Sequence, residues 1–173
     1  MKKLILGATG SIGSSLAKKL VESGDQVHLV GREEASLSSL ASELNSSFTT
    51  CDVIEENFCE KILNDLKDEP IDGLAFCIGS IDLKPLKLTK KSDFMKSFNL
   101  NLVSATEVIR SLADNLKKNK GSIVLFSTVA VRQGFPNHAI VSSAKGAIEG
   151  LTLALAAEFA PNVRVNCIAP SLT

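Results

Sequence analysis

The sequence predicts an α/β fold: a doubly wound parallel sheet of about six strands, or Rossmann fold, with helices on both faces. Short apolar segments alternate with helical patterns along the 173 residues, as βαβ units require. A glycine-rich turn with Gly7, Gly10 and Gly13 joins the first apolar segment to the first helix. Residues 74–78 are wholly apolar, which is typical of a parallel strand covered on both faces. No repeat or linker interrupts the pattern, so residues 1–173 are interpreted as one domain.

The expected elements follow one another in a regular order. Strands are expected at residues 1–6, 26–30, 47–52, 74–78, 122–126 and 163–168. Apolar residues recur at helical spacing between them, which predicts helices from the turn to Ser23 and over residues 33–44, 55–67, 92–118 and 139–160. Ser92 is expected to cap the first of the two long helices. Residues 79–89 and 132–138 are expected to form loops.

Composition and charge exclude several classes of protein. The chain has 19 basic and 19 acidic residues, so neither nucleic acid nor an anionic membrane surface is expected as a partner. No apolar run is expected to approach the ~20 residues of a membrane span. Residues 1–6 are interpreted as a strand and not as a signal peptide.

The cysteines and histidines indicate structural roles. The four cysteines lack paired spacing and only two histidines are present, so we expect reduced core thiols, a cytoplasmic protein and no metal site. His28 alternates with apolar neighbours inside a strand. It is therefore interpreted as a strand-face residue in preference to a catalytic group.

The glycine-rich turn predicts a dinucleotide-binding site. In such a turn one glycine allows the tight bend, a second lets a pyrophosphate approach the backbone, and a third lets helix and strand pack closely. The free amides and the positive dipole end of the following helix then face the anion. The alternative is a tight strand-to-helix turn that binds no ligand. The glycine-rich turn lies at the start of a βαβ unit, and this position favours the dinucleotide.

Further motifs follow the turn, and their joint order is informative. They are Asp52-Val53 after the third expected strand, Gly79 after the fourth, Asn101 in a long helix, Ser127-Thr128 after the fifth strand, Lys145 in the second long helix, and Arg164-Val165-Asn166 leading to Ala169-Pro170. In this order and spacing the chain resembles the short-chain dehydrogenase/reductase family over its entire length. The resemblance implies the strand order 3-2-1-4-5-6, with a nicotinamide dinucleotide crossing the carboxyl ends of the strands.

The resemblance also implies cofactor contacts residue by residue. The pyrophosphate would lie against the turn, at Gly7, Thr9, Gly10, Ser11, Ile12 and Gly13, and Gly79 would belong to the same cofactor site. Asp52 and Val53 would meet the adenine, with Asp52 accepting from its amino group; a helix N-cap before Glu55 is the alternative interpretation of Asp52. Lys145 would donate to the nicotinamide ribose hydroxyls, and its apolar sequence neighbours favour this role over that of a solvated helix lysine.

The residues after the second strand bear on the type of cofactor. A carboxylate at the end of that strand would bond the ribose 2′-hydroxyl of NAD and repel a 2′-phosphate. This chain has Gly31 followed by Arg32, whose forked guanidinium suits a phosphate by charge and geometry. NADP is therefore expected over NAD, although Glu33 and Glu34 lie nearby.

The chain departs from the family at the residue that donates the proton. The family's tyrosine falls at Val141, four residues before Lys145, and the chain contains no tyrosine at all. The family's substrate-orienting serine falls at Thr128, which keeps a hydroxyl. Asn101 falls where the family's asparagine holds a water of the proton relay. The resemblance thus implies a proton relay that keeps the asparagine, at Asn101, but lacks the tyrosine that donates the proton.

Another side chain would have to replace the missing acid. His138 is the candidate, because it lies about one helical turn before Val141 and histidine suits acid–base work near neutral pH. A cap or surface role at a loop-to-helix junction is the alternative. Ser142 and Ser143 are also considered, but an unassisted hydroxyl has too high a pKa for this task.

Two further departures concern the turn and the end of the chain. Ser11 stands where the family's common spacing has a glycine, so the turn resembles that of atypical members. The sequence ends at residues 169–173, where the family's substrate-covering loop and last strand would follow. We therefore expect a fragment or a shortened protein without that lid, in which the strand 163–168 would be an exposed edge.

Three functions remain open at this point. The resemblance implies an NAD(P)-dependent oxidoreductase that transfers hydride between nicotinamide and a small carbonyl or alcohol, with Asn101, Thr128, Lys145 and His138 as the polar site. The alternatives are a dinucleotide-binding or sensing module and a structural partner of family relatives, which the loss of tyrosine favours. The helices 92–118 and 139–160 resemble the pair through which relatives dimerise, so a homo-oligomer is expected.

Overall fold

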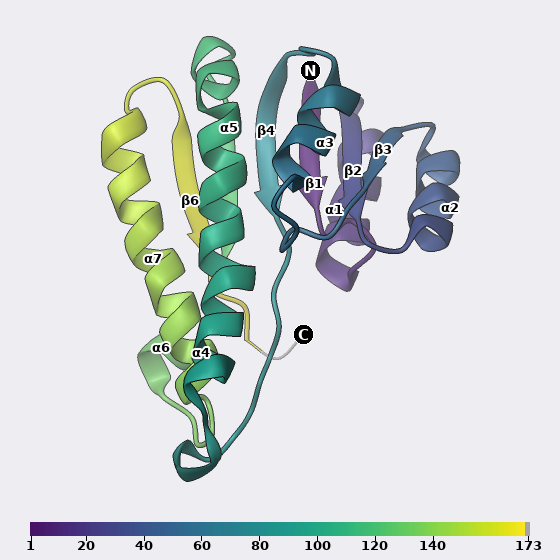
Figure 1. Cartoon of the computed structure of the whole chain (residues 1–173). Helices are drawn as coiled ribbons and strands as arrows, with labels where there is room; N and C mark the ends of the chain where they lie inside the picture. Colours follow the sequence, from purple (N-terminus) through teal and green to yellow (C-terminus); the bar gives the residue numbers. More distant parts are fainter. Residues whose placement is uncertain (172–173) are drawn as a thin grey trace.

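The computed structural model describes residues 1–171, and it contains one six-stranded sheet in the order β3-β2-β1-β4-β5-β6 (Figure 1). The strands are β1 (Lys2–Leu6), β2 (Gln26–Gly31), β3 (Ser47–Thr50), β4 (Ile71–Phe76), β5 (Ser122–Phe126) and β6 (Arg164–Ile168). Every neighbouring pair is parallel. The predicted fold and strand order are therefore confirmed, and the carboxyl ends of the strands meet at one edge of the sheet.

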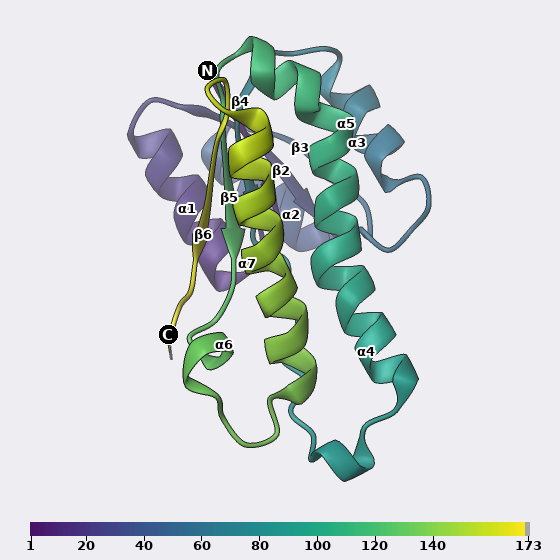
Figure 2. The same ribbon diagram turned by 90° about the vertical axis from the view of Figure 1, so that its left-hand side faces the viewer.

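Helices lie on both faces of the sheet, as predicted (Figure 2). They are α1 (Ser11–Glu22), α2 (Glu34–Leu44), α3 (Phe58–Leu66), α4 (Lys91–Phe98), α5 (Ser104–Lys118), α6 (Ala130–Gln133) and α7 (Ala139–Phe159). A 3₁₀ turn, η1 (Leu86–Leu88), precedes α4, and a π-helical turn, η2 (Asn99–Val103), joins α4 to α5. Helices α1 and α2 pack on one face, and α3, α5 and α7 pack on the other.

The side chains of β1 alternate between two hydrophobic cores. Leu4 and Leu6 are fully buried in the larger core, beneath α3, α5 and α7. Ile5 is fully buried in the smaller core, beneath α1 and α2. Because a shift by one residue would exchange these faces, the alternation fixes the register of β1 and the position of the turn that follows it.

The fourth strand begins earlier than its sequence predicts. β4 starts at Ile71 and not at residue 74, because the Ile71 amide donates to Asn115 Oδ1 at 2.8 Å and the strand pairs with β1 from Lys2 onward. Gly73 pairs with Lys3, and a Cβ atom at Gly73 would be 2.5 Å from Lys3 Cδ. The predicted end at residue 78 is also wrong, since the strand ends at Phe76.

The segment between β3 and α3 is a turn, where the sequence predicts the end of a strand and a longer helix. β3 ends at Thr50, and Asp52 Oδ1 accepts the Ile54 N–H at 3.3 Å. α3 then begins only at Phe58. The interpretation of Asp52 as a helix N-cap is therefore wrong, because its carboxylate closes this turn instead.

The helix predicted at residues 92–118 is divided into two. α4 begins at Lys91, so its N-cap is Lys90 and not the predicted Ser92. The Oδ2 of Asp93, in the first turn, accepts the Lys90 N–H at 2.8 Å. The π-helical turn η2 then widens the backbone around Asn101 before α5 continues. Short helices also occupy parts of the predicted loops, as η1 and the end of α6 show.

Helix α7 is the longest helix of the described chain. Within residues 1–171 it alone is long and apolar enough, by length and composition, to cross a membrane, with a mean hydropathy of 1.3 over the relevant window. This corrects the expectation that no apolar stretch approaches such a length. The helix carries Lys145 and Glu149 and packs against β5 and β6, so it is also a covering helix of the sheet.

The cysteines and His28 have the structural roles that the sequence predicts. All four cysteines are free, with Cys51 buried and the other three partly buried. His28 is 1% exposed and faces β3, where its ring contacts the hydroxyls of Ser47 and Thr49. Within residues 1–171 no cluster of three or more histidine, cysteine or acidic side chains could hold a metal ion.

Candidate active site

The turn between β1 and α1 depends on two glycines. Gly7 has a φ of +74°, which lies in the left-handed region that glycine adopts easily. At Gly13 a Cβ atom would lie 2.2 Å from the Gly7 carbonyl oxygen, so only glycine lets α1 pass so close to the turn. Gly10 precedes α1 as its N-cap. Gly7 therefore allows the bend, and Gly13 allows the close packing of α1 against the turn.

The first turn of α1 presents backbone amides beyond the strand ends. The first helical hydrogen bond runs from the Ser14 N–H to the Gly10 oxygen at 2.8 Å. The amides of residues 11–13 consequently have no acceptor within the helix. Residues 9–12 are exposed, and no acidic side chain lies in the first helical turn. This end of α1 therefore fits an anion such as the pyrophosphate of a dinucleotide.

Three residues that are distant in sequence converge beyond the end of β4. A Cβ atom at Gly79 would lie 2.9 Å from Lys145 Nζ and 3.1 Å from Asn101 Oδ1. Asn101 is fully buried in η2, where its Nδ2 donates to the Ser97 oxygen at 2.9 Å and its Oδ1 has no hydrogen-bond partner. Because Gly79 has no side chain, a donor and an acceptor can both lie against its backbone, where they could bind the hydroxyls of one ligand.

The Lys145 amine lies in an unusual environment. Its residue is 8% exposed, and burial lowers its pKa to about 8, against smaller opposite effects of the Cys167 and Cys77 thiols. No carboxylate of the described chain pairs with the amine, although buried lysines are rare without such a partner. The interpretation of Lys145 as a solvated helix lysine is therefore wrong, because the amine is directed into the site.

Thr128 follows β5 and keeps a usable hydroxyl. Its Oγ1 accepts the Ala130 N–H at 3.3 Å, at the start of α6. Within residues 1–171 the hydroxyl donates to no other group, so its proton is free for a substrate oxygen.

A link from β5 to α7 was not predicted from the sequence. Ser127 is buried, and its Oγ donates to Glu149 Oε1 at 2.7 Å. The other carboxylate oxygen of Glu149 lies 3.7 Å from Arg132 Nε. Because Glu149 follows Lys145 by one helical turn, this link fixes the end of β5 relative to the helix that carries Lys145. The four-residue spacing was the only signal for it.

Val141 and His138 do not complete the polar site. Val141 is 3% exposed and lies one helical turn before Lys145. His138 N-caps α7, about 10 Å from Lys145 along the helix axis. Its Nδ1 lies 2.7 Å from the Pro136 oxygen, and its ring packs on Phe135 with centroids 5.4 Å apart.

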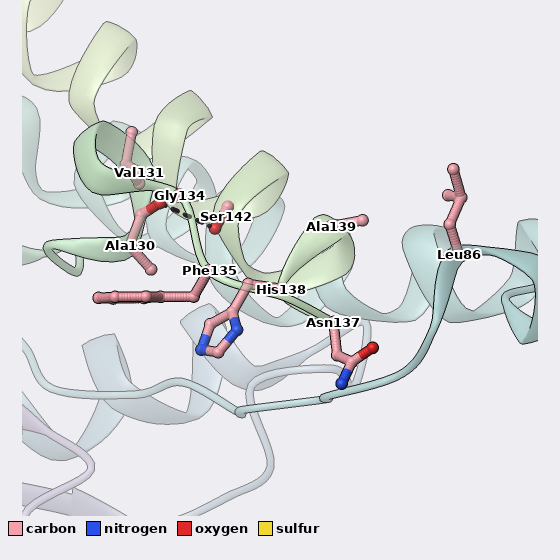
Figure 3. A pocket seen from close by; sticks show the side chains of 9 residues that line it. All are labelled: Leu86, Ala130, Val131, Gly134, Phe135, Asn137, His138, Ala139 and Ser142. Carbon is pink, nitrogen blue, oxygen red and sulfur yellow. Dashed lines mark hydrogen bonds between the residues drawn. The ribbon is translucent and has the colours of Figure 1, made fainter.

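The surroundings of His138 form a separate hollow of about 330 Å³ (Figure 3). It lies between α6, the start of α7 and Leu86, and its lining includes neither Thr128 nor Lys145. Ser142 lines it and donates to the Ala130 oxygen at 3.3 Å, which the dashed line in Figure 3 marks. Ser143 donates to the Ala139 oxygen at 2.7 Å. Neither serine is therefore in place to act as an acid.

The ends of β2 and β3 carry the other predicted cofactor residues. Arg32 Nη1 lies 3.8 Å from Asp52 Oδ2, and the Arg32 side chain is 75% exposed. Thr9 lies beside them, since a Cβ atom at Gly31 would be 3.6 Å from its Oγ1. Val53 is 4% exposed and packs in the larger core, so only its backbone could meet an adenine.

Comparison with known proteins agrees with this geometry. Residues 7–173 match a family described as "Enoyl-(Acyl carrier protein) reductase". L-xylulose reductase of Bos taurus is 32% identical over 99% of this chain and 71% of its own length. Carbonyl reductase (NADPH) 2 of Sus scrofa is likewise 32% identical, over 99% of this chain and 71% of its own. A short chain dehydrogenase from Shigella flexneri has a TM-score of 0.91 at 27% identity, covering 98% of this chain and 71% of that chain.

The fold and the site together define an oxidoreductase domain that binds a nicotinamide dinucleotide. The chain belongs to the short-chain dehydrogenase/reductase family, as its motifs imply. Its reaction class is therefore NAD(P)-dependent oxidoreduction, which confirms the reaction class of the first function considered from the sequence.

Proposed function

We propose that this chain binds NADPH and uses it to reduce a small carbonyl compound to the alcohol. The observation that carries the proposal is the convergence of Lys145 Nζ and Asn101 Oδ1 at Gly79. This convergence and the glycine-rich turn belong to one site, because a Cβ atom at Gly7 would lie 3.0 Å from the backbone of Cys77, two residues before Gly79.

The residues present fit the pyrophosphate and the nicotinamide ribose of a dinucleotide. The close approach at Gly13 and the free amides of α1 suit the pyrophosphate. The unpartnered Asn101 Oδ1 can accept from a ribose hydroxyl, and the Lys145 amine can donate to one. The bound nicotinamide would supply the hydride, while these side chains hold its ribose beside the strand ends.

Arg32 supports NADP as the preferred cofactor. Its guanidinium is largely exposed beyond β2, and its only ion pair in the described chain is the 3.8 Å contact with Asp52. It can therefore turn its donors toward a 2′-phosphate. The name of one relative, carbonyl reductase (NADPH) 2, is consistent with this choice.

Small carbonyl compounds are the proposed substrates. Relatives are named L-xylulose reductase and carbonyl reductase, and both names describe the reduction of a carbonyl group. In this chain the free hydroxyl of Thr128 could orient the substrate oxygen.

Assembly and location form part of the proposal. Homo-oligomers would form through the helices α4–α5 and α7, on which Val103 in the joining turn is 43% exposed and Leu153 is 74% exposed. Exposed leucine and valine on neighbouring long helices are typical of a helix-packing surface. The four free thiols agree with a cytoplasmic protein.

A dinucleotide-binding module without turnover is the second candidate, and Val141 is the observation that favours it. A valine side chain cannot transfer a proton, and the chain contains no tyrosine. Such a module would bind NADPH as described above and leave it unoxidised.

Titration of the protein with NADPH and NADH, followed by nicotinamide fluorescence, tests the proposal. We expect NADPH to bind about tenfold more tightly, since charge-assisted hydrogen bonds contribute about 1.5–3 kcal/mol. Arg32→Ala should abolish the preference, and the exposed Arg110→Ala, on α5, serves as the matched control. Binding of neither dinucleotide would overturn the proposal. Oxidation of NADPH with small ketones would then separate the reductase from the binding module.

A further inference from the structure

The position of Lys145 differs from that of an ordinary structural lysine. The residue is 8% exposed and its amine lies beside Gly79, yet the amine has no hydrogen-bond or ion-pair partner within residues 1–171. Burying an unpaired ammonium is unfavourable, so packing alone gives no reason for a lysine here. The amine lies instead against Gly79, on the same side of the glycine backbone as Asn101 Oδ1.

The groups around the amine leave it able to hold and release a proton near neutral pH. Burial is the main cause that lowers its pKa to about 8. The titratable groups that face it are the Cys77 thiol, after β4, and the Cys167 thiol, on β6. No carboxylate of residues 1–171 contributes to its pKa shift, and Glu149 on the same helix accepts from Ser127. Within residues 1–171 the ammonium therefore has no counter-ion.

Within residues 1–171 no other side chain at the site could serve as the acid. Burial raises the pKa of the Cys77 thiol to about 12 and also raises that of the Cys167 thiol. Val141 is apolar, and Asn101 has an amide that does not titrate. The Thr128 hydroxyl has too high a pKa to give up its proton unassisted. His138 lines the separate hollow about two helical turns away. Among residues 1–171, only Lys145 both lies at Gly79 and has a proton that it can release near neutral pH.

We propose that Lys145 itself is the general acid of the reduction, in place of a phenol. This inference rests on the proposed function. In the step, a hydride with its electron pair is transferred from the reduced nicotinamide to the carbonyl carbon. The π electron pair of the carbonyl moves to its oxygen, and that oxygen takes a proton from the Lys145 ammonium, directly or through one water. The neutral amine then regains a proton from solvent.

The proposal predicts a pH dependence that a purely ribose-binding lysine would not produce. With NADPH and a small ketone, kcat/KM should fall above about pH 8, by tenfold per pH unit, as the acid is lost. Lys145→Arg keeps a positive charge but cannot release a proton, so it should lower kcat by about 100-fold or more. NADPH affinity should change only several-fold, and Lys118→Arg, at the exposed end of α5, is the matched control.

A second measurement does not depend on activity. The rate at which acetic anhydride acetylates Lys145 in the wild-type protein, followed by mass spectrometry against pH, reports the titration of the amine. A midpoint near pH 8 is expected, whereas a lysine with an unperturbed pKa would show a midpoint at about 10.4.

The outcomes separate this proposal from the function on which it rests. If the protein binds and oxidises NADPH but kcat/KM is flat from pH 7 to about 10, or the Lys145 midpoint lies above 10, Lys145 is not the acid. Near-wild-type kcat in Lys145→Arg would lead to the same conclusion. If NADPH does not bind at all, the fluorescence titration identifies the proposed function as the failure, and the general-acid role falls with it.

Discussion

Protonation of His28 should weaken the fold in mild acid. Its Nδ1 lies 2.8 Å from Ser47 Oγ and its Nε2 lies 2.9 Å from Thr49 Oγ1. The Thr49 hydroxyl donates to Asp65 Oδ2 at 2.6 Å, so its oxygen can only accept from the ring. The proton of the neutral ring therefore sits on Nε2, and Nδ1 accepts from Ser47, whose oxygen accepts from Lys2 Nζ at 3.3 Å.

The magnitude follows from the titration of the ring. Burial, and to a smaller extent the charge of Lys2, lower the pKa of His28 from 6.5 to about 4. Between these values the unfolded chain binds a proton that the folded chain refuses, so stability is present above pH 6.5 and is lost as the pH falls toward 4. At about 1.36 kcal/mol per pKa unit, the loss reaches roughly 3 kcal/mol.

Denaturant unfolding between pH 7.5 and 4.5 measures this loss. Carboxylates titrate in the same range, so the informative quantity is the difference between wild type and His28→Phe. The variant should be less stable at pH 7, by about 1–3 kcal/mol, because Ser47 and Thr49 lose a partner. Its free energy of unfolding should nevertheless fall less steeply with acid. His138→Phe removes the other histidine as a control, and equal slopes for His28→Phe and wild type would refute the reasoning.

Two further results are expected. Lys145→Met should raise the free energy of unfolding at pH 7 by up to about 3 kcal/mol, because burial penalises the charged amine. The gain should shrink as the pH rises from about 8 to 10.5, where the folded wild type has already lost the proton; a constant gain over pH 7–10.5 would contradict the burial penalty. Gly13→Ala places a Cβ atom 2.2 Å from the Gly7 oxygen and should cost about 1–3 kcal/mol together with NADPH binding. Gly150→Ala is the control: nothing lies near a Cβ atom there, so the variant should stabilise α7 by up to about 1 kcal/mol. Equal changes in stability and NADPH binding for the two variants would refute the role of Gly13.

The sequence predicts those parts of the fold that follow from local patterns. The alternation of Leu4, Ile5 and Leu6 and the glycines of the first turn are local signals, and both strand and turn lie where they predict. The start of β4 could not be predicted in this way, because it depends on a hydrogen bond from Ile71 to Asn115, 44 residues later. The N-cap at Lys90 was missed because serine, as at Ser92, is a preferred cap residue and lysine is not.

The candidate site could be predicted only where a family motif carries it. Asn101, Lys145 and Gly79 come from three elements, and no local pattern shows that their atoms meet. The resemblance brought them together, and the structure agrees. His138 does not lie with these three residues. It is close to Val141 in the sequence, but at the end of α7 its side chain lines a separate hollow.

The environment of Lys145 also bears on whether the chain merely binds a dinucleotide. A buried lysine without a counter-ion lowers stability, and a neutral side chain at this place would make the fold more stable. Ribose binding needs a hydrogen-bond donor, which a well-paired lysine with an ordinary pKa would also supply. A lowered pKa adds nothing to that task, but it brings the proton of the amine into the range in which a general acid works. The unpaired amine beside Val141 therefore favours a reductase with a relocated acid over a binding module.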